Sequence, residues 1–379
     1  MILMKNLISY KVKNRIKIFF KNKIRDNCST KIKWMSSHHY ADFYNAEWTL
    51  AYQRSSTHYK PVLSIGKIKV NFGQMIVSEL PELGVLKISE GHVLCPQGWV
   101  LSKEGNLLPE HSWYGRHISE MKMPSRLPNE IYISGNVLSL LSDWADKNYG
   151  HFLLDSLTRY HLFKKAGLSI NDVDCVLCPG SDNQGRKNLI QKLGIPLDKC
   201  MWVCEDTLIT AETLFVTSFP GIRRNYQSWQ AHYLKNAFGV VNESSNRKLY
   251  VTRNNCTRKV ANEEDVISLV QSYGYEIYNP TEHNDTISDF GSANMVIGPH
   301  GAGLADIVFC SPGARVLELI PSDHIYPYYY TLAESAGLKY ACIVSRSLTN
   351  RRKPTKGPSQ YDFSVNIDEL KQAIDSFLQ

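Results

Sequence analysis

The feature of this sequence that most constrains its fold is a regular alternation of short apolar segments and amphipathic segments from about residue 130 onward. The apolar segments have the length and the Val, Ile and Leu content of buried strands, whereas the others repeat apolar residues at helical spacing. Strands that alternate with helices need right-handed crossovers and therefore form parallel sheets. The strands are expected at 131–141, 174–179, 200–204, 208–218, 248–253, 275–280, 294–301, 315–321 and 339–345, and the helices at 149–166, 183–194, 225–239, 262–274, 286–293, 303–310, 326–336 and 368–378.

The alternation divides into two blocks, and the short polar stretch at residues 242–246 is the best candidate for a linker between them. Two such blocks in tandem predict an α/β fold with two Rossmann-like domains that face each other across a cleft. The first domain is expected at residues 126–241 and the second at residues 247–345.

Two further regions flank these blocks. Residues 34–125 read as short strands separated by turns, with a hairpin signal at Glu104-Gly105, and they predict a small β-rich N-terminal region. Residues 346–379 are expected to form a loop and a last helix that packs back on the first domain.

Basic residues are concentrated in an N-terminal arm. Residues 1–33 contain ten Lys or Arg and one acidic residue, while the rest of the chain is nearly neutral. A protein that binds nucleic acid more often carries its charge over a folded face, so nucleic acid is not expected as a partner. Within residues 1–25, apolar residues at positions 8, 12, 16, 19 and 20 recur at helical spacing among the basic ones. This pattern predicts a basic amphipathic helix on an anionic membrane surface; the alternatives are a helix packed on the body and a solvated tail.

Two absences from the sequence concern its location. The sequence has no run of about 18 apolar residues and no uninterrupted apolar segment of the kind found in a secretory signal. We therefore expect a cytoplasmic protein, peripheral on the inner face of the cell membrane if the arm binds lipid.

The nine cysteines are an odd number spread over a long chain, so they do not predict a disulfide framework. Cys175-x2-Cys178 followed by Cys200-x3-Cys204 approximates the spacing of a zinc site. Both segments, however, have the length and apolar character of buried strands, in which cysteine behaves as a small apolar residue. We interpret them as strands.

Ligands of open parallel sheets bind at the carboxyl ends of the strands, and the loop Gly298-Pro-His-Gly-Ala-Gly303 is the strongest candidate there. Its glycines let the backbone approach a ligand closely, and the helix that follows favours anions. The loop is neither GxGxxG nor GxxxxGK[ST], so it does not support a dinucleotide dehydrogenase or a P-loop ATPase. His300 between glycines has little use in a core, which favours ligand binding over the alternative of a capped tight turn.

A second loop follows the predicted strand at 248–253 and contains Arg253, Arg258 and Lys259. Guanidinium groups clustered at the carboxyl end of a strand suit a pyrophosphate. The alternative is a set of ordinary solvated charges.

The third candidate is the start of the helix expected at 149–166. At 100° per residue, Asn148, His151, Asp155 and Arg159 fall on one side of this helix. Such a stripe is a plausible acid–base site, whereas an ordinary exposed face would be richer in Lys and Glu. The alternative is a solvated polar face.

At this point three segments carry a resemblance to a known family: NYGHFLLDSLTRY (148–160), KLYVTRNNCTRKVANEEDV (248–266) and SANMVIGPHGAGLADIVFCSPGARVLELIP (292–321). In content, order and spacing they resemble the family 61 glycosyltransferases. That family includes plant xylosyltransferases, endoplasmic-reticulum N-acetylglucosaminyltransferases and bacterial capsule-polysaccharide enzymes. The resemblance implies a GT-B architecture, a nucleotide-sugar donor and inversion at the anomeric carbon.

Roles for individual residues follow from this resemblance. Either His151 or Asp155 is expected to be the catalytic base, with Asn148 and Arg159 binding the acceptor in the first domain. Glu318 is placed like the acid that binds the ribose hydroxyls in two-domain transferases. The donor-binding residues expected in the second domain are Arg253, Arg258, Lys259, His300, Gly301, Ala302, Gly303, Leu304 and Glu318.

No divalent metal or other cofactor is expected, because the arginines and a helix N-terminus already supply positive charge for the diphosphate. Asp172-Val-Asp174 spells the DxD of metal-dependent sugar transferases, but it directly precedes a buried strand and is interpreted as a strand edge. The expected reaction moves a sugar from a nucleotide-sugar donor to a glycan or lipid-linked glycan in bacterial surface polysaccharide synthesis. The alternative is a non-catalytic nucleotide-binding protein on the same fold.

Overall fold

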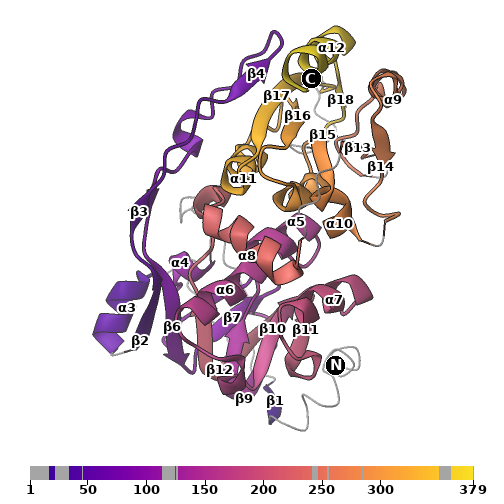
Figure 1. Cartoon of the computed structure of the whole chain (residues 1–379). Helices are drawn as coiled ribbons and strands as arrows, with labels where there is room; N and C mark the ends of the chain where they lie inside the picture. Colours follow the sequence, from indigo (N-terminus) through magenta and orange to yellow (C-terminus); the bar gives the residue numbers. More distant parts are fainter. Residues whose placement is uncertain are drawn as a thin grey trace. The chain divides into compact units, whose positions relative to one another are not determined.

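The computed structural model describes residues 17–21, 34–44, 46–112, 124, 127–240, 246–253, 256–283, 285–349 and 360–378. The chain divides into two compact units, each made of two stretches of sequence. Unit 1 contains residues 1–56 and 79–224, and unit 2 contains residues 57–78 and 225–379. Figure 1 labels the helices and strands of both units.

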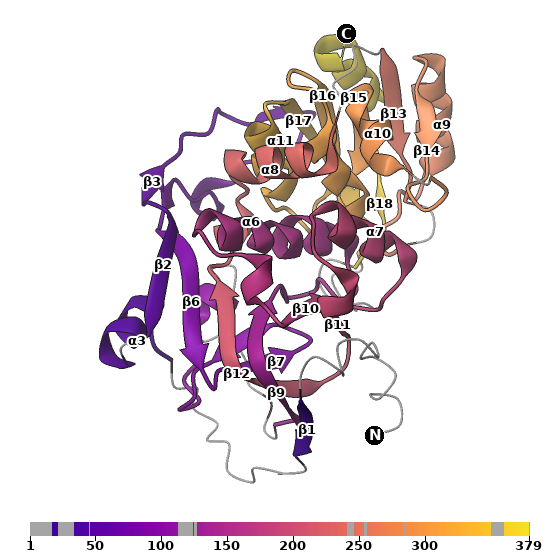
Figure 2. The ribbon, with the colours of Figure 1, turned by 60° about the horizontal axis from the view of Figure 1, so that its bottom comes forward.

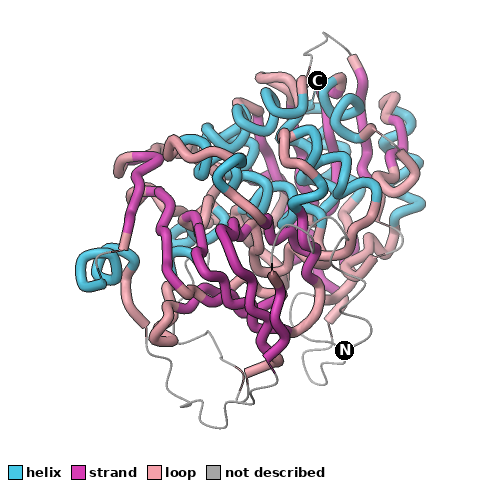
Figure 3. The backbone as a smooth tube through the Cα atoms, turned by 90° about the horizontal axis from the view of Figure 1, so that it is seen from below, coloured by secondary structure: helices cyan, strands magenta, loops and turns pink. Residues whose placement is uncertain are grey.

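The sheet of unit 1 has a parallel centre with the strand order β11-β10-β9-β12, to which β6 and then β2 add in antiparallel orientation. Numbered along the chain from β9, this centre has the order 3-2-1-4 of a Rossmann half. Figure 2 shows these strands side by side, and Figure 3 shows the sheet from below. The strands of unit 1 are β1 (Ile18–Lys21), β2 (Glu47–Tyr52), β3 (Ser55–Ser56), β5 (Glu79–Leu80), β6 (Leu83–Ser89), β7 (His92–Cys95), β8 (Trp99–Leu101), β9 (Glu130–Ser139), β10 (Cys175–Pro179), β11 (Cys200–Val203) and β12 (Thr207–Thr217).

The central strands of unit 1 form because their sequences are continuously apolar. Every residue of β10 and β11 is buried, as expected for parallel strands covered on both faces. The cysteines at 175, 178 and 200 therefore lie in the core, which confirms the interpretation of these segments as strands. The helices of unit 1 are α3 (Ser37–Tyr44), α4 (Pro109–Ser112), α5 (Tyr149–His151), the π-helix η3 (Phe152–Ser156), α6 (Leu157–Lys165), η4 (Ile170–Asp172), α7 (Gln184–Lys192), η5 (Leu197–Lys199) and η6 (Ile222–Arg224).

The sheet of unit 2 is parallel in the order β14-β13-β15-β16-β17, with β4 added in parallel to β17 and β18 in antiparallel orientation. Numbered from β13, its order is 2-1-3-4-5, the second common arrangement of doubly wound folds. Its strands are β4 (Leu63–Ile65), β13 (Arg247–Val251), β14 (Glu276–Tyr278), β15 (Ala293–Pro299), β16 (Arg315–Pro321), β17 (Lys339–Ser347) and β18 (Phe363–Ser364). The two sheets confirm the predicted α/β class.

The helices of unit 2 pack on this sheet around a core of Val, Ile, Leu and aromatic side chains. They are η1 (Gly73–Met75), α8 (Ser228–Phe238), α9 (Glu263–Ser272), α10 (Thr286–Gly291), η7 (Ala302–Phe309), α11 (Tyr328–Ala336), α12 (Ile367–Ala373) and η8 (Ile374–Leu378). The segment η7 is a 3-10 helix where the sequence predicted a helix at 303–310. Among the described residues, no helix combines the length and the apolar character needed to cross a membrane.

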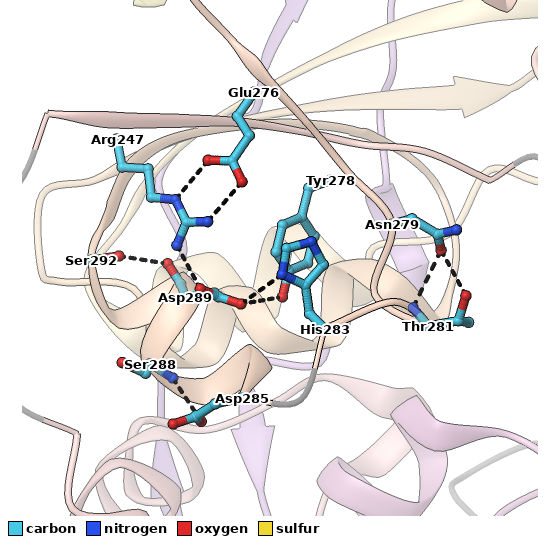
Figure 4. A network of polar contacts seen from close by, with 10 residues as sticks. All are labelled: Arg247, Glu276, Tyr278, Asn279, Thr281, His283, Asp285, Ser288, Asp289 and Ser292. Atoms are coloured by element: carbon cyan, nitrogen blue, oxygen red, sulfur yellow. Dashed lines mark hydrogen bonds and ion pairs between the residues drawn. The ribbon is translucent and has the colours of Figure 1, made fainter.

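The edge strand β14 and helix α10 are held to β13 by a polar network (Figure 4). Arg247 donates two hydrogen bonds to Glu276, of 2.9 and 2.8 Å, and one of 2.6 Å to Asp289. The other oxygen of Asp289 accepts from the Tyr278 hydroxyl at 2.9 Å and pairs with Nδ1 of His283 at 3.2 Å. The rings of Tyr278 and His283 stack with their centroids 4.0 Å apart. This network fixes both ends of the connection between β14 and α10.

The units differ from the expected domain boundaries in three places. The helix at 228–238 lies in unit 2, where α8 packs on η7 and α11, so the expected first domain at 126–241 ends too late. Residues 57–78 also belong to unit 2, because β4 pairs with β17. In the rest of the expected β-rich region at 34–125, strands β2, β6, β7 and β8 join the sheet of unit 1, and only β3 and β5 form a separate pair among the described residues.

Two further expectations are corrected near the ends of the chain. The last helix packs within unit 2, since Leu370 and Ile374 are buried in its core, and not on the first domain. In the N-terminal arm, residues 18–21 form strand β1, which pairs with β9, so the predicted helix does not extend over them. The remaining arm residues lie outside the described residues.

Two consecutive antiparallel turns lie in the region of the predicted hairpin. Strands β7 and β8 are joined by a turn that contains Gly98, whose φ of 74° favours glycine. At Glu104-Gly105 the chain turns again, and an antiparallel bridge between Leu101 and Leu107 follows, with backbone hydrogen bonds on either side of it. The predicted turn is therefore confirmed, and the hairpin of β7 and β8 precedes it.

Candidate functional site

In open parallel sheets, ligands bind where consecutive connections leave a strand edge in opposite directions. In unit 1 that switch point lies between β9 and β12, because the chain continues from β9 to β10 on one side and returns to β12 on the other. The helix that begins at Tyr149 follows β9, and the segment ending at Arg224 follows β12. Side chains from both connections meet at this edge.

The helix after β9 begins at Asn148, whose side-chain oxygen accepts a hydrogen bond of 3.3 Å from the backbone N–H of His151. One turn later, Nδ1 of His151 lies 2.9 Å from Oδ2 of Asp155. Residues 152–156 form a π-helical turn within the otherwise α-helical segment. Such turns are frequent at functional sites, because they shift the register of the side chains that follow.

Asp155 is fully buried and accepts a second hydrogen bond, of 3.1 Å, from Nε of Arg224. Burial alone would raise the pKa of Asp155, but the hydrogen bond from His151 and the charge of Arg224 outweigh it and hold the pKa below its usual value. Burial and the charge of Arg224 lower the pKa of His151. Asp155 is therefore a carboxylate and His151 a neutral imidazole near pH 7.

This arrangement can act as a base. With Nδ1–H donating to Asp155, Nε2 of His151 is the basic nitrogen, and the His151 side chain is 20% exposed. The carboxylate orients the ring and stabilises the imidazolium that forms when a proton is taken up. The prediction left open which of the two residues is the base; the geometry favours His151, with Asp155 as its partner.

The other two residues of the predicted stripe have structural contacts. Arg159 is 2% exposed, and its guanidinium donates to the backbone oxygens of Thr217 at 3.1 Å and of His111 at 3.0 Å. Burial lowers the pKa of Arg159 to about 10. The sequence predicted that Arg159 binds the acceptor. The structure places its side chain in the core instead, because the π-helical turn rotates it there. Asn148 caps its helix.

Unit 2 has its switch point between β13 and β15, since the chain leaves β13 toward β14 on one side and returns to β15 on the other. The loop after β13 contains Arg253, and the loop after β15 contains Gly301. A Cβ placed on Gly301 would lie 1.7 Å from Nη1 of Arg253, so the guanidinium lies directly against this glycine. At Gly298 a Cβ would lie 2.8 Å from Leu304, which explains the close approach of η7 to the strand.

Arg258 is the second guanidinium at this edge. Its backbone is in the left-handed region with φ of 63°, and its Nε and Nη1 are buried with no hydrogen-bond partner among the described residues. Burial and the neighbouring Arg253 lower the pKa of Arg258, although Tyr329, Asp323 and Glu318 act in the opposite direction. Nε of Arg253 donates to the backbone oxygen of Thr257 at 2.8 Å, so the unsatisfied N–H groups belong to Arg258. Two adjacent cations, one of them with unsatisfied N–H groups, suit an anion.

His300 lies between these loops and is 3% exposed. Its Nδ1 contacts Oε1 of Glu318, and the hydroxyl of Tyr340 donates to the other oxygen of that carboxyl group. Burial raises the pKa of Glu318 to about 8, and burial together with Arg258 and Arg253 lowers the pKa of His300. Both groups thus resist becoming charged. Glu318 orients the imidazole and is not placed to bind ribose hydroxyls, because both its oxygens are used within the core.

The remaining predicted donor residues surround the start of η7. The N–H of Leu304 is used in the first turn, where it donates to the oxygen of Gly301 at 2.9 Å. The N–H groups of Ala302 and Gly303 precede that turn and have no partner within the helix. Lys259 has an exposed side chain, and its backbone N–H donates to Asp362 at 2.9 Å.

The sequence analysis expected no divalent metal and interpreted Asp172-Val-Asp174 as a strand edge. Within the described ranges, no group of three or more His, Cys, Asp or Glu is arranged to hold a metal ion. The carboxylate of Asp174 accepts a hydrogen bond of 2.8 Å from the N–H of Asn136, beside the amino end of β10. This contact confirms the strand-edge interpretation of the DxD sequence.

Three residues of these sites were missed by sequence reasoning. Arg224 lies in a loop with no motif, and its φ of 53° is unusual for arginine. His324 follows β16, and its ring lies edge-on to His300 with the centroids 4.6 Å apart. The hydroxyl of Tyr329 donates to the oxygen of Gly301 at 2.5 Å. The position of His324 just after a parallel strand was the one available signal.

Two sheets with parallel centres, each with polar and charged side chains gathered at its switch point, are typical of ligand-binding α/β proteins. Residues 149–317 match the family described as Glycosyltransferase 61. They therefore form a domain of glycosyltransferase family 61, as the resemblance implied. The matched segment begins at α5 and includes His151, Asp155, Arg253 and Arg258.

Two curated proteins are similar to shorter parts of the chain. It is 28% identical over 90 residues to alpha-1,3-arabinosyltransferase XAT2 of Oryza sativa subsp. japonica, covering 22% of this chain and 15% of that protein. It is 31% identical over 71 residues to beta-1,2-xylosyltransferase of Arabidopsis thaliana, covering 19% of this chain and 13% of that protein. The matches thus span about one seventh of the length of each relative.

Proposed function

We propose that the protein is an inverting glycosyltransferase that moves a sugar from a nucleotide-sugar donor to a glycan acceptor. The observation that carries this proposal is the pair Arg253 and Arg258 beside the glycine loop, with buried N–H groups of Arg258 that have no partner in the part of the chain that the structure describes. A diphosphate is the leaving group of such a donor and satisfies these groups. The family 61 domain supports the same reaction class.

In the proposed reaction, Nε2 of His151 takes the proton of the acceptor hydroxyl while that oxygen attacks the anomeric carbon. The bond from this carbon to the diphosphate oxygen breaks, and the electron pair leaves with the nucleoside diphosphate. Arg253 and Arg258, with the N–H groups of Ala302 and Gly303, stabilise the charge that develops on the leaving group. One displacement on the face opposite the diphosphate inverts the anomeric carbon.

Further parts of the proposal concern the setting of this reaction. Unit 1 binds the acceptor and unit 2 the donor, in a GT-B arrangement of the two. The names of the two relatives make pentosyl donors the first to test, with hexosyl donors next. The acceptor is a glycan or lipid-linked glycan of bacterial surface polysaccharide synthesis, and the protein is cytoplasmic and peripheral on the membrane. The N-terminal arm supports the membrane part of this proposal through its ten basic residues.

The proposed catalysis needs no divalent metal, because the two guanidinium groups carry the charge that a metal carries in other transferases. Loss of transfer in EDTA and its recovery with manganese would contradict this part of the proposal. Membrane binding is tested by co-sedimentation with anionic and neutral vesicles at low and high salt. Equal pelleting of the full chain and a chain lacking residues 1–25 would contradict the membrane part.

The central experiment is a thermal-shift panel of UDP-, GDP-, CMP- and TDP-sugars, followed by transfer assays with the donor that stabilises the protein. We expect one nucleotide class to raise the Tm of the wild type and to have no such effect on Arg258→Met. Lys371→Met is the matched control, since Lys371 is an exposed lysine on α12 of the same unit. The proposal fails if no nucleotide-sugar or nucleoside diphosphate raises the Tm.

The non-catalytic alternative predicts nucleotide binding without transfer to any acceptor. The His151–Asp155 pair argues for the enzyme, because a protein that only binds nucleotide in unit 2 has no use for an oriented imidazole in unit 1. Donor hydrolysis or transfer that is lost in His151→Gln would exclude this alternative.

A further inference from the structure

We propose that His324 is a fourth anion-binding side chain of the unit 2 site, and that its imidazole takes up one proton from solvent when a diphosphate binds. This inference rests on the proposed function and deepens it by coupling donor binding to a proton. We use the name arginine–histidine cluster for Arg253, Arg258, His300 and His324.

The position of His324 follows from the sheet. The backbone N–H of His324 donates to the oxygen of Pro321, the last residue of β16, at 2.9 Å. The arginine–histidine cluster therefore comes from the carboxyl ends of three adjacent strands, β13, β15 and β16. The ring of His324 lies edge-on to His300 at 4.6 Å and to Tyr326 at 4.7 Å, measured between centroids.

One nitrogen of the His324 ring is left unsatisfied in the described part of the chain. Its Nδ1 is buried and has no hydrogen-bond partner among the residues that the structure describes. Two other histidines have partners: Nδ1 of His92 lies 2.7 Å from the hydroxyl of Thr210, and Nε2 of His161 lies 2.7 Å from that of Tyr52. His111, which is fully buried in unit 1, resembles His324 instead, since neither of its ring nitrogens has a partner within the described ranges. A buried polar atom without a partner costs stability, so its retention at the donor edge points to a ligand.

The charges around His324 explain why it is neutral in the free protein. Burial, His300, Arg258 and Arg253 together lower the pKa of His324 to about 2. Two acidic residues lie at the same edge, but Glu318 is held by His300 and Tyr340, and Asp323 accepts from Ser347. Three tyrosines, 326, 328 and 329, also face the cluster, and burial raises the pKa of Tyr329, which keeps it uncharged.

A bound diphosphate reverses this balance. Its negative charges neutralise the two guanidinium groups that oppose protonation of His324, and its oxygens accept from an imidazolium N–H. The proton comes from solvent and stays on His324 while the anion is bound. Departure of the anion restores the repulsion and releases the proton.

The test is calorimetric titration of the full chain with inorganic pyrophosphate between pH 6 and pH 8, in two buffers of different ionisation enthalpy. The difference between the buffers gives the number of protons taken up. We expect the wild type to take up about one proton more than His324→Gln, and His324→Gln to bind about tenfold more weakly at pH 6. Ionisation of pyrophosphate itself affects both proteins equally, so the comparison isolates His324.

His232→Gln is the matched control, because His232 is an exposed histidine on α8 of the same unit. It is expected to behave like the wild type. If His324→Gln does not fold, His324→Asn serves as the second variant, with circular dichroism and the Tm as folding criteria.

The outcomes separate this inference from the proposed function. Equal proton uptake and equal affinity in wild type and His324→Gln overturn the inference and leave the donor site in place. Absence of pyrophosphate binding to the wild type overturns both. Binding that is lost in Arg258→Met but unchanged in His324→Gln supports the anion site and rejects His324 as part of it.

Discussion

Replacement of Asp155 by asparagine tests the unit 1 site most directly. Asp155 is fully buried, and its Oδ2 accepts hydrogen bonds from Nδ1 of His151 at 2.9 Å and Nε of Arg224 at 3.1 Å. In Asp155→Asn, the amide keeps the shape of the side chain but removes its charge. Arg224, which is 4% exposed, is then left without its neutralising carboxylate.

The magnitudes follow from these contacts. Removing one partner of a buried ion pair costs about 3 kcal/mol or more, and the amide oxygen that still accepts from Arg224 keeps the loss near this lower value. An oriented general base contributes about 100- to 10 000-fold to a rate, so kcat is expected to fall within that range. The uncompensated charge of Arg224 lowers the pKa of His151 further and weakens it as a base.

The assay compares kcat for sugar transfer, urea-induced unfolding, and affinity for pyrophosphate. We expect a large loss of kcat, a measurable loss of stability, and unchanged pyrophosphate affinity, since the anion site belongs to unit 2. Asp174→Asn is the control, because Asp174 also accepts a hydrogen bond, from the backbone of β9, but is exposed and lies at the opposite end of the strands. A folded Asp155→Asn protein with kcat within threefold of the wild type would refute the proposed dyad.

Three further outcomes are expected. In Gly301→Ala the new methyl group displaces Arg253, so pyrophosphate affinity should fall about tenfold or more in calorimetry, while Gly185→Ala, whose Cβ meets only an ordinary contact, should not change it. Arg159→Met leaves two backbone oxygens unsatisfied and should lower the free energy of unfolding, measured in urea, by roughly 2–4 kcal/mol. The kcat of the folded variant should be nearly unchanged. A selective rise in the KM for the acceptor would instead support an acceptor-binding role for Arg159. His111 is fully buried, and burial and Arg159 lower its pKa from 6.5 to about 4. Between these two pH values the unfolded chain binds a proton that the folded chain does not, so the free energy of unfolding should fall by about 3 kcal/mol as the pH drops from 6.5 to 4. His111→Phe should make the free energy of unfolding less dependent on pH in urea titrations at pH 4.5 and 7. An unchanged pH dependence in this variant would contradict the assignment.

The parallel centres of both sheets were predictable because their strands are continuously apolar and end in glycine, proline or polar residues. The segments β10 and β16 lie within one residue of their expected bounds. Loops that follow such strands can be identified as ligand sites from sequence alone. For this reason Arg253, Arg258 and the glycine loop were found at the edge where the structure has them.

What the sequence could not supply is long-range packing. The helical projection put Arg159 on the stripe with His151, but a π-helical turn changed the register between them. Arg224 has no motif, because its contact with Asp155 depends on a return from β12 after more than sixty residues of chain. Glu318 looked available for a ligand because its partner Tyr340 lies on the next strand.

The segment at residues 57–78 has a consequence for how this protein can be divided. It adds β4 to the edge of β17, and the backbone oxygen of Lys60 accepts from Tyr330, while the side chain of Asn225 bonds to the backbone of Met75 and Val77. A fragment that starts at residue 225 would lose all these contacts and expose a bare strand edge open to self-association.

Unit 2 is thus encoded by two separate stretches of sequence, residues 57–78 and 225–379. Suppose that donor specificity is exchanged between related transferases by joining two parent sequences at residue 225 alone. The transferred unit 2 then lacks β4, and its sheet is incomplete. A chimera that also carries residues 57–78 from the same parent keeps β4 with its sheet. The three junctions 56/57, 78/79 and 224/225 are therefore the positions at which the two units can be exchanged.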